Sequence, residues 1–537
     1  MKQQTRSFAI RPLLAGVATV AMIAAGSAIA GTPKDMLVHA KDISDTITLD
    51  PAEVFEFTGG EVVANVYDRV MMFEPEDLSK LVGGVAESFS VSDDGKTVTL
   101  KIRAGQKFHS GNPVTANDVA YSLQRVIKLK KTPSFIFTQF GWDKDNVDGL
   151  IKATGPDTVA VTINSAFSPG LLLNALSAGV GSVVDMQTVE ANAKDGDMGY
   201  AWMKNHSAAS GAYSVKTWKA NELIMMEAHQ AYRHGTPKMK RVVLRHVAEP
   251  SAQRLLLEKG DVDLARDLTP DQIKGLAGNK DIVVDDYPKA ALIYLAANGT
   301  HPLLGKPDML NALRYMVDYK GMESSFLAGQ YKVHQSFWPS GLWGSLDGQA
   351  YKTDMAKAKM LAEQAGAGKG GDPIVIDTLT NPPYPDIAQS IQQSLSELGV
   401  KSEIMLSEGK TLWPKYRARK HQLIVAQWSP DYVDPHSNAD AFAHNPDNRL
   451  EAKLTGKPAW RTAYDDKEVT AMTEAAAAEL DLVKRKQMYL DLQKKVQSSS
   501  NFVMMFQNKE QLARRANVKG YVSGANFDLV FYRNVTK

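Results

Sequence analysis

One segment of the sequence, residues 427–435, carries side chains that could bind a charged ligand. It reads Gln-Trp-Ser-Pro-Asp-Tyr-Val-Asp-Pro, so Asp431 and Asp434 each stand beside a proline. A carboxylate enclosed in a cleft makes a strong charge-assisted hydrogen bond with an ammonium group, and without such a partner it is costly to desolvate. The spacing alone favours a simpler role, because Asp next to Pro commonly shapes turns.

Aromatic side chains near this segment and near the start of the chain offer surfaces for a ligand. Trp428 follows the apolar run 423–425, and its ring can wall a pocket or complete the core at the end of a strand. Phe55 and Phe57 precede the glycine pair 59–60, a pattern that predicts a loop whose backbone approaches a ligand. Packing of these aromatic rings is an equally good interpretation.

Motifs for catalysis and for metal binding are absent from the sequence. It has no G-x-S-x-G elbow, no H-E-x-x-H pair and no G-x-G-x-x-G fingerprint. The glycine-rich run 366–371 lacks the spacing of a phosphate-binding loop and fits a connection ahead of a strand. His436 lies near Asp434 and Asp440, but Asp and His beside Pro and Asn are more often turn formers than metal ligands. We therefore assign no catalytic residue, no metal site and no cofactor.

The composition is that of a globular protein with more than one structural unit. The chain has 537 residues, of which 44% are hydrophobic and 23% charged, and this length exceeds what one hydrophobic core usually supports. The lack of cysteine excludes disulfides, a thiolate nucleophile and Cys-ligated metal clusters. The formal net charge of +2 is too small to indicate a nucleic-acid-binding protein.

The first 30 residues have the three-part pattern of a cleavable secretory signal. An apolar run at 13–25 ends in the small-residue segment 28–30 and is preceded by three basic residues, Lys2, Arg6 and Arg11. The run of about 13 residues is shorter than the roughly 20 needed to cross a bilayer. Cleavage is expected after Ala30, which leaves 507 residues and changes the formal net charge from +2 to −1. We expect the mature protein in a bacterial periplasm.

Two stretches of the mature chain predict regular elements. In the first, a turn at 93–95 precedes an alternating segment at 97–103 that is typical of a half-buried strand. Thr115 can cap a following helix, with Asp118 as its capping-box partner. In the second, residues 374–406 predict a strand, a helix that stops at Gly399, and another strand.

The second pattern is a βαβ unit, which normally has parallel strands. A long helical stretch is predicted from 468 to 497. Mixed strands early in the chain and a βαβ unit late in it indicate an α/β protein of at least two lobes.

The ordered pattern at 86–125 resembles the peptide/nickel class (family 5) of ABC-transporter solute-binding proteins. In that family a turn, a strand ending in Arg, a G-x-K-F-H-x-G loop and a T-A-x-D-V-x-x-S helix start follow one another. Here these parts occupy 93–95, 97–103, 105–111 and 115–122. Gln106 departs from the pattern, since the family usually has an aliphatic residue there. Similar segments extend over the mature chain, at 48–51, 66–70, 210–213, 257–263 and 427–435.

This resemblance implies a two-lobe periplasmic-binding-protein fold, class II-like and of cluster C, with α/β lobes joined by a two-strand hinge. The first lobe would comprise 31–288 and 507–537, with an extra subdomain at about 76–210, and the second would comprise 289–506. The implied activity is binding without catalysis. A monomer closes on a short peptide (di- or oligopeptide) or a peptide-like amine, and delivers it to an ABC permease and ATPase in the inner membrane, with no nucleic acid involved.

The resemblance also implies ligand contacts. In peptide-binding members the Asp three residues after the Trp of the 427–435 segment pairs with the ligand's α-amino group, and that position is Asp431. Trp428 and Phe57 would line the same site. A dipeptide also needs a partner for its carboxylate, but no motif selects Arg417 or Arg419 for it.

Two kinds of alternative stay open at this stage. The family also includes binders of opines, sugars, haem and nickel complexes, so the same receptor fold could carry one of these. An exported hydrolase of peptides or amides is the alternative from another functional class.

Overall fold

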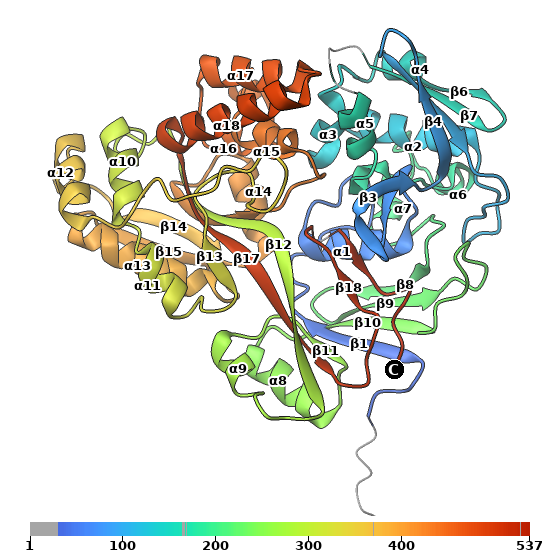
Figure 1. Cartoon of the computed structure of the whole chain (residues 1–537), viewed down its shortest axis with the longest axis horizontal. Coiled ribbons are helices and arrows are strands. Elements are labelled where there is room, and N and C mark those ends of the chain that lie inside the picture. Colours follow the sequence, from blue (N-terminus) through green and yellow to red (C-terminus); the bar gives the residue numbers. More distant parts are fainter. Residues whose placement is uncertain (1–30, 164–166, 168, 369, 527) are drawn as a thin grey trace, which may run out of the picture.

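Two long antiparallel strands form the spine of the molecule. The computed structural model describes residues 31–163, 167, 169–368, 370–526 and 528–537, so the predicted signal segment lies outside the described residues. Strands β12 (Ile282–Ala297) and β17 (Phe502–Arg515) pair side by side and run across the molecule (Figure 1). The expected lobe boundaries at 288 and 506 fall inside these two strands and remain predictions.

The spine belongs to a sheet of eleven strands within the described residues. Its order is β15–β14–β16–β12–β17–β11–β1–β10–β9–β8, with β13 also paired to β17. Strands from the first 265 residues therefore lie on one side of the spine, and strands from 374–428 lie on the other. Besides the spine, the strands are β1 (Met36–Lys41), β8 (Tyr213–Lys219), β9 (Leu223–Ala228), β10 (Arg241–His246), β11 (Leu264–Ala265), β13 (Tyr331–Val333), β14 (Ile374–Leu379), β15 (Ser402–Ser407) and β16 (Leu423–Trp428).

The predicted βαβ unit is confirmed. Strands β14 and β15 pair in parallel, from Ile374 opposite Ser402 to Leu379 opposite Ser407. The helix between them, α13 (Tyr384–Glu397), buries one apolar face that includes Ile387, Ile391 and Leu395. Because these apolar residues recur every four positions, one stripe of the helix can cover the sheet while the other faces solvent.

The predicted strand and capped helix in the first half of the chain are also confirmed. A four-stranded antiparallel sheet has the order β4 (Ala86–Val91), β5 (Thr97–Ile102), β7 (Thr158–Thr162) and β6 (Ile151–Gly155). Helix α2 (Ala116–Leu129) begins with a full capping box between Thr115 and Asp118. Gln106 donates a 2.8 Å hydrogen bond to buried Asp68, so a polar contact stands where the family has an aliphatic one.

The prediction of one helical stretch from 468 to 497 is wrong at its centre. The structure has two helices, α17 (Lys467–Ala478) and α18 (Leu482–Ser499). Glu479 is extended, and the Asp481 side chain caps α18 by accepting from the backbone N–H groups of Val483 and Lys484 at 2.9 Å each. A favourable cap can end one helix and start another inside a segment of uniformly high helix propensity.

Short helices fill the remaining connections. They are α1 (Phe57–Val66), α3 (Phe135–Thr138), α4 (Val147–Leu150), α5 (Pro169–Ala175), α6 (Met186–Ala191), α7 (Tyr200–Met203), α8 (Pro250–Lys259), α9 (Pro270–Lys274), α10 (Pro307–Met316), α11 (Tyr319–Ser324), α12 (Met355–Ala365), α14 (Gly409–Arg417), α15 (Pro435–Phe442) and α16 (Pro458–Arg461). Two further strand pairs are β2 (Met71–Glu74) with β3 (Asp77–Gly83) and β18 (Val522–Ser523) with β19 (Val530–Phe531). None of the described helices has the length and hydropathy that a membrane span requires.

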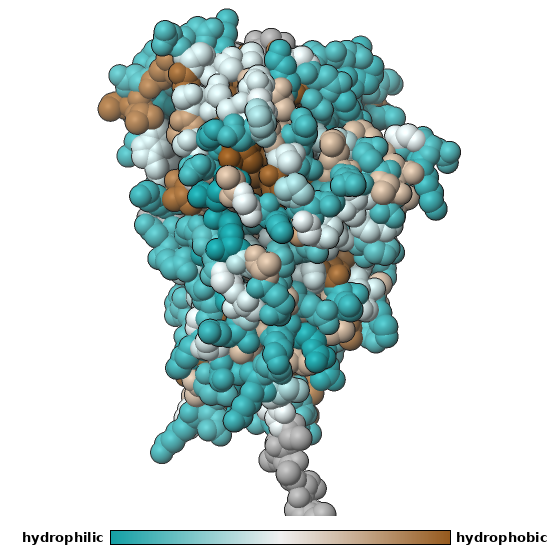
Figure 2. Space-filling model, turned by 90° about the vertical axis from the view of Figure 1, so that its right-hand side faces the viewer, coloured by the Kyte–Doolittle hydropathy of each residue, from teal (hydrophilic) through white to brown (hydrophobic). Residues whose placement is uncertain are grey.

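The buried apolar side chains form two principal clusters. One gathers side chains from the β4–β7 sheet and α2 together with those of β12, β16 and α13. The other joins the two ends of the chain, because it combines residues of 37–67 and 184–244 with residues of 512–535. The surface at the right of Figure 1 is mostly hydrophilic, with small separate apolar groups (Figure 2).

Candidate ligand-binding site

Two adjoining cavities lie beside the spine. The larger has a volume of about 670 Å³ and the smaller about 120 Å³. They share four lining residues, Asp45, Phe57, Trp413 and Gln427. Their walls combine residues from both sides of the spine, so a molecule bound here would contact both parts of the chain.

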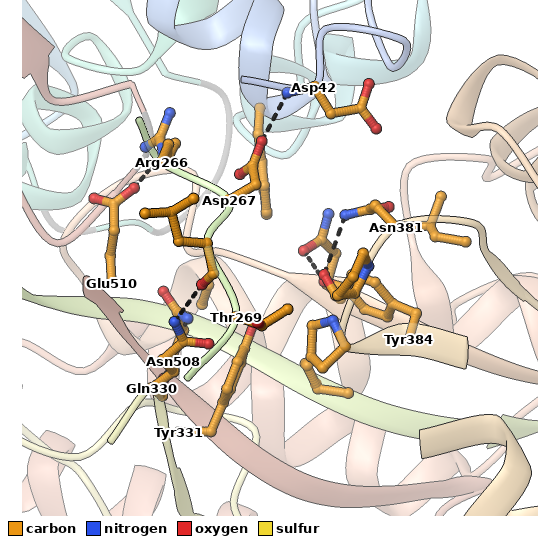
Figure 3. Close-up of a pocket in the computed structure, with 18 of the residues that line it drawn as sticks. Asp42, Arg266, Asp267, Thr269, Gln330, Tyr331, Asn381, Tyr384, Asn508 and Glu510 are labelled. Atoms are coloured by element: carbon orange, nitrogen blue, oxygen red, sulfur yellow. Dashed lines mark hydrogen bonds and ion pairs between the residues drawn. The ribbon is translucent and has the colours of Figure 1, made fainter. Parts of the chain in front are cut away.

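The larger cavity is lined by polar side chains from several elements (Figure 3). Arg266 and Glu510 lie on one side, and Asn381 and Tyr384 lie across from them. Arg266 pairs with Glu510 and also with Glu61. Burial disfavours the ionised form of Glu510, yet the charges of Arg266 and Lys289 hold its pKa at about 2. The charges on this side are therefore largely compensated within the protein.

Asp431 lies on the wall of the smaller cavity, in the loop between β16 and α15. Its backbone N–H donates a 2.8 Å hydrogen bond to the Ser437 hydroxyl, which fixes the loop. Its carboxylate oxygen Oδ2 is buried and has no hydrogen-bond partner. Burial, together with the negative charges of Asp528 and Asp440, raises the pKa of Asp431 well above its ordinary value. A cation beside this carboxylate would reverse that shift.

Asp434, only three residues later, has a structural role. Its Oδ1 accepts a 2.9 Å hydrogen bond from the His436 N–H and so caps α15. Both of its oxygens bind the guanidinium of Arg485 at 2.8 Å. The hydrogen-bonding capacity of this carboxylate is thus used inside the protein, in agreement with the turn-shaping role that its spacing indicates.

Trp428 takes part in both the core and the cavity wall. It is the last residue of β16 and is 5% exposed. Its ring lies edge-on to Phe55 at 5.5 Å and to Phe442 at 5.6 Å, while it also lines the smaller cavity. Its indole nitrogen is buried and has no hydrogen-bond partner. The two interpretations of Trp428 are therefore compatible.

Phe57 lines both cavities, but the loop predicted around it is a helix. It is the first residue of α1, and the glycine pair 59–60 lies within that helix. A Cβ atom at Gly59 would come within 2.9 Å of a Val54 methyl group. The small residue at 59 therefore allows close packing against Val54, which the sequence pattern alone did not distinguish from approach to a ligand.

Among the described residues, two arginines line the smaller cavity, Arg417 and Arg461. Arg417 was considered from the sequence, but no motif selected it. Arg417 forms a 2.8 Å ion pair with Glu56. Arg419 binds Asn448 instead, at 2.9 Å through Nη2, and does not line either cavity. Arg461, at the end of α16, lines the smaller cavity and was missed because the run 458–461 carries no motif.

A family model decides the class of protein. The model for bacterial extracellular solute-binding proteins, family 5 (middle) matches residues 80–449. The chain belongs to this family.

Known proteins resemble this family 5 protein over nearly its whole length. The probable D,D-dipeptide-binding periplasmic protein DdpA of Escherichia coli K12 is 28% identical over 533 residues, which is 98% of this chain and 99% of DdpA. The periplasmic binding protein DppA of Helicobacter pylori, solved with the peptide STSA, has a TM-score of 0.81 at 21% identity and covers 93% of this chain and 98% of its own.

A third similar protein is the dipeptide-binding protein of Pseudoalteromonas sp. SM9913, solved with Met-Leu. It has a TM-score of 0.82 at 19% identity and covers 94% of this chain and all (100%) of its own. These likenesses confirm the predicted periplasmic-binding-protein fold and the predicted family. The similar proteins named here are binding proteins.

The hypothesis of a metal site at His436 finds no support in this family 5 protein. Within the described ranges, no group of three or more His, Cys, Asp and Glu side chains is placed to hold a metal ion. Asp440 is used by two other partners, His444 at 2.8 Å and Lys457. The assignment of Asp431, Trp428 and Phe57 as ligand contacts remains a prediction.

Proposed function

We propose that this protein is the substrate-binding component of an ABC importer and that it binds a dipeptide, or a similarly short peptide with a free amino group. One observation carries the proposal: the buried Oδ2 of Asp431 has no partner and lies on the wall of a cavity. An ammonium group bound there would restore the compensation that a buried carboxylate needs. The apolar rings of Trp428 and Phe57 would enclose the rest of the ligand.

The known proteins support this choice of ligand. DdpA is named for D,D-dipeptides, and the Pseudoalteromonas protein was solved with Met-Leu. The cavity beside Asp431 measures about 120 Å³ and the adjoining one about 670 Å³, so together they have room for a short peptide.

Capture would proceed by closure of two lobes about the spine. β12 and β17 each contribute residues to the wall of the larger cavity, so bending of these two strands would move the walls relative to each other. A monomer in the periplasm, released by cleavage after Ala30, would then deliver its ligand to a membrane permease driven by an ATPase.

Calorimetry on the mature protein tests this function. We expect saturable, stoichiometric binding of Ala-Ala, studied in its L,L and D,D forms, and about 2.7 kcal/mol of stabilisation at 100 times the Kd. Nickel–histidine, an opine and a simple sugar serve as competing ligand classes under the same conditions. Binding of one of these classes in place of any dipeptide would contradict the proposal. Turnover of the peptide during the titration would instead indicate a hydrolase.

A further inference from the structure

A second charged group on the wall of the smaller cavity lacks a partner. Arg461 is 3% exposed, and its Nη2 is buried without a hydrogen-bond acceptor. Within the described part of the chain, no acidic side chain lies within ion-pair distance of its guanidinium. Burial, together with the nearby positive charge of Arg417, lowers the pKa of Arg461 to about 10.

The guanidinium of Arg461 is nevertheless held in a defined orientation. Its Nε donates a 2.7 Å hydrogen bond to the Thr455 carbonyl. Its central carbon lies 5.0 Å from the ring centroid of Tyr416 and 5.6 Å from that of Trp428. These contacts leave the buried Nη2 available for a further acceptor. A fixed, planar guanidinium is well suited to a carboxylate, which can accept two parallel hydrogen bonds.

Arg417, the other arginine on this wall, is less suitable. It already forms a 2.8 Å ion pair with Glu56, and both side chains are largely buried. A ligand carboxylate that bound Arg417 would have to compete with that acid. Arg461 is therefore the cation on this wall whose charge is not neutralised by a bonded acid.

Two opposite charges thus line one small cavity without a hydrogen bond or ion pair between them. The Asp431 carboxylate and the Arg461 guanidinium each retain an unpartnered buried atom. Buried charges of this kind are costly unless they are paired. A single zwitterionic molecule can pair both of them at once.

We propose that Arg461 binds the carboxylate of the ligand, so that the protein selects a small zwitterion whose ammonium faces Asp431 and whose carboxylate faces Arg461. This assignment rests on the proposed function and narrows it to dipeptides with a free C-terminus. Dipeptide amides and esters, which keep the ammonium but lose the negative charge, are then poor ligands.

Binding of matched ligands to the wild-type protein provides the first test. Ala-Ala and its C-terminal amide differ only in the charge that Arg461 would recognise. We expect the amide to bind about 100-fold more weakly, the order of loss found when one partner of a buried charge pair is removed. Equal affinity for the acid and the amide would overturn the role of Arg461 and leave the proposed function standing. If no dipeptide binds the wild type, the function and this assignment fall together.

Substitution of Arg461 provides the second test. Arg461→Gln should weaken Ala-Ala about 100-fold but change the affinity for the amide little, so that the preference for the acid disappears. Arg461→Lys should recover part of the preference, since it keeps the charge but not the planar fork. Arg449→Gln is the matched control, because that arginine is exposed and does not line the cavity. An equal loss of affinity for acid and amide in Arg461→Gln would show that Arg461 only supports the wall.

Discussion

The carboxyl group of Asp431 and the guanidinium of Arg461 line the same cavity of about 120 Å³, and each keeps one buried polar atom without a partner. Arg461 lowers the pKa of Asp431, but burial and the neighbouring acids outweigh it. The empty site is therefore electrostatically unsatisfied. A ligand whose charges pair with both groups should therefore stabilise the folded protein when it binds.

Asp431→Asn should abolish binding of amine-bearing ligands without destabilising the free protein. The amide cannot pair with an ammonium as a charge, so we expect the affinity for Ala-Ala to fall about 100-fold or more. In thermal melts the ligand-dependent shift should then disappear at concentrations that saturate the wild type. A variant that keeps the full shift would show that Asp431 is not the amine site.

The pH dependence of the unfolding free energy of the ligand-free protein should also report on the Asp431 carboxyl group. Because the folded-state pKa of Asp431 is raised, the native state binds more protons than the unfolded state above pH of about 3.9. This group therefore makes the wild type less stable as pH rises from there towards the raised pKa. Compared with wild type, Asp431→Asn should gain stability over that range in denaturant titrations. A difference that does not vary with pH would contradict the assigned shift.

Asp434→Asn is expected to destabilise the free protein and to leave ligand recognition unchanged, which is the opposite of the result expected for Asp431→Asn. Asp434 caps α15 and binds both Nη atoms of Arg485, so its loss leaves a buried guanidinium unpaired. We expect about 3–5 kcal/mol of destabilisation, as when one partner of a buried ion pair is removed. The ratio of affinities for a dipeptide and its N-acetyl derivative should stay as in the wild type. Loss of that discrimination would assign Asp434 to the ligand.

Glu61→Gln should destabilise the protein by about 3–5 kcal/mol at neutral pH. Glu61 is fully buried and pairs with Lys41 at 2.8 Å and with Arg266. Burial opposes its ionisation, but these two cations keep its pKa below the ordinary range. Its contribution is thus present above the unfolded-state pKa of about 4.3 and is lost as pH falls below it. The difference in unfolding free energy between Glu61→Gln and wild type, measured by urea unfolding, should become smaller at acidic pH.

An exposed acid serves as the control for that experiment. Glu468 pairs with Lys495 at the surface, where the acid is 67% exposed. Glu468→Gln should leave the urea midpoint unchanged, because exposed pairs contribute little. A similar loss in both variants would mean that the effect of Glu61 is not due to burial.

Thr115→Ala should cost about 1 kcal/mol of unfolding free energy. The hydroxyl of Thr115 and the carboxylate of Asp118 satisfy each other's backbone N–H groups at the start of α2. Thr411→Ala, at an exposed position of α14, is the matched control and should not lower stability. Equal unfolding free energies for Thr115→Ala and wild type would show that water replaces the cap without loss.

Local patterns predicted much of the fold because the residues that determine each element are close in sequence. The alternation at 97–103, the Thr115 cap and the 374–406 unit all occur as predicted. The break at 479–481 was missed because helix propensity does not register a competing cap such as Asp481. The helix at Phe57 was not predicted because a glycine pair can serve either a loop or close packing. The sequence does not show that Gly59 packs against Val54.

Residues of the candidate site were predicted only where a local sequence pattern marks them. The segment 427–435 led to Asp431 and Trp428, both of which line the smaller cavity. Arg461 lies 30 residues further on, in a helix with no motif, and reaches the cavity through tertiary packing on Tyr416 and Trp428. The tertiary fold brings these residues together, so their spacing in the sequence does not reveal the contact.

The pairing of β12 with β17 constrains the order in which the molecule can form. β17 begins at Phe502, so its pairings with β12 and β11 cannot form until almost the whole chain is present. Glu61 likewise bonds Tyr532, and Asn65 accepts from the backbone N–H of Tyr532 at 2.9 Å. Contacts over such sequence separations form slowly. A chain emerging from its N-terminus therefore lacks these contacts of its first half until its last residues arrive.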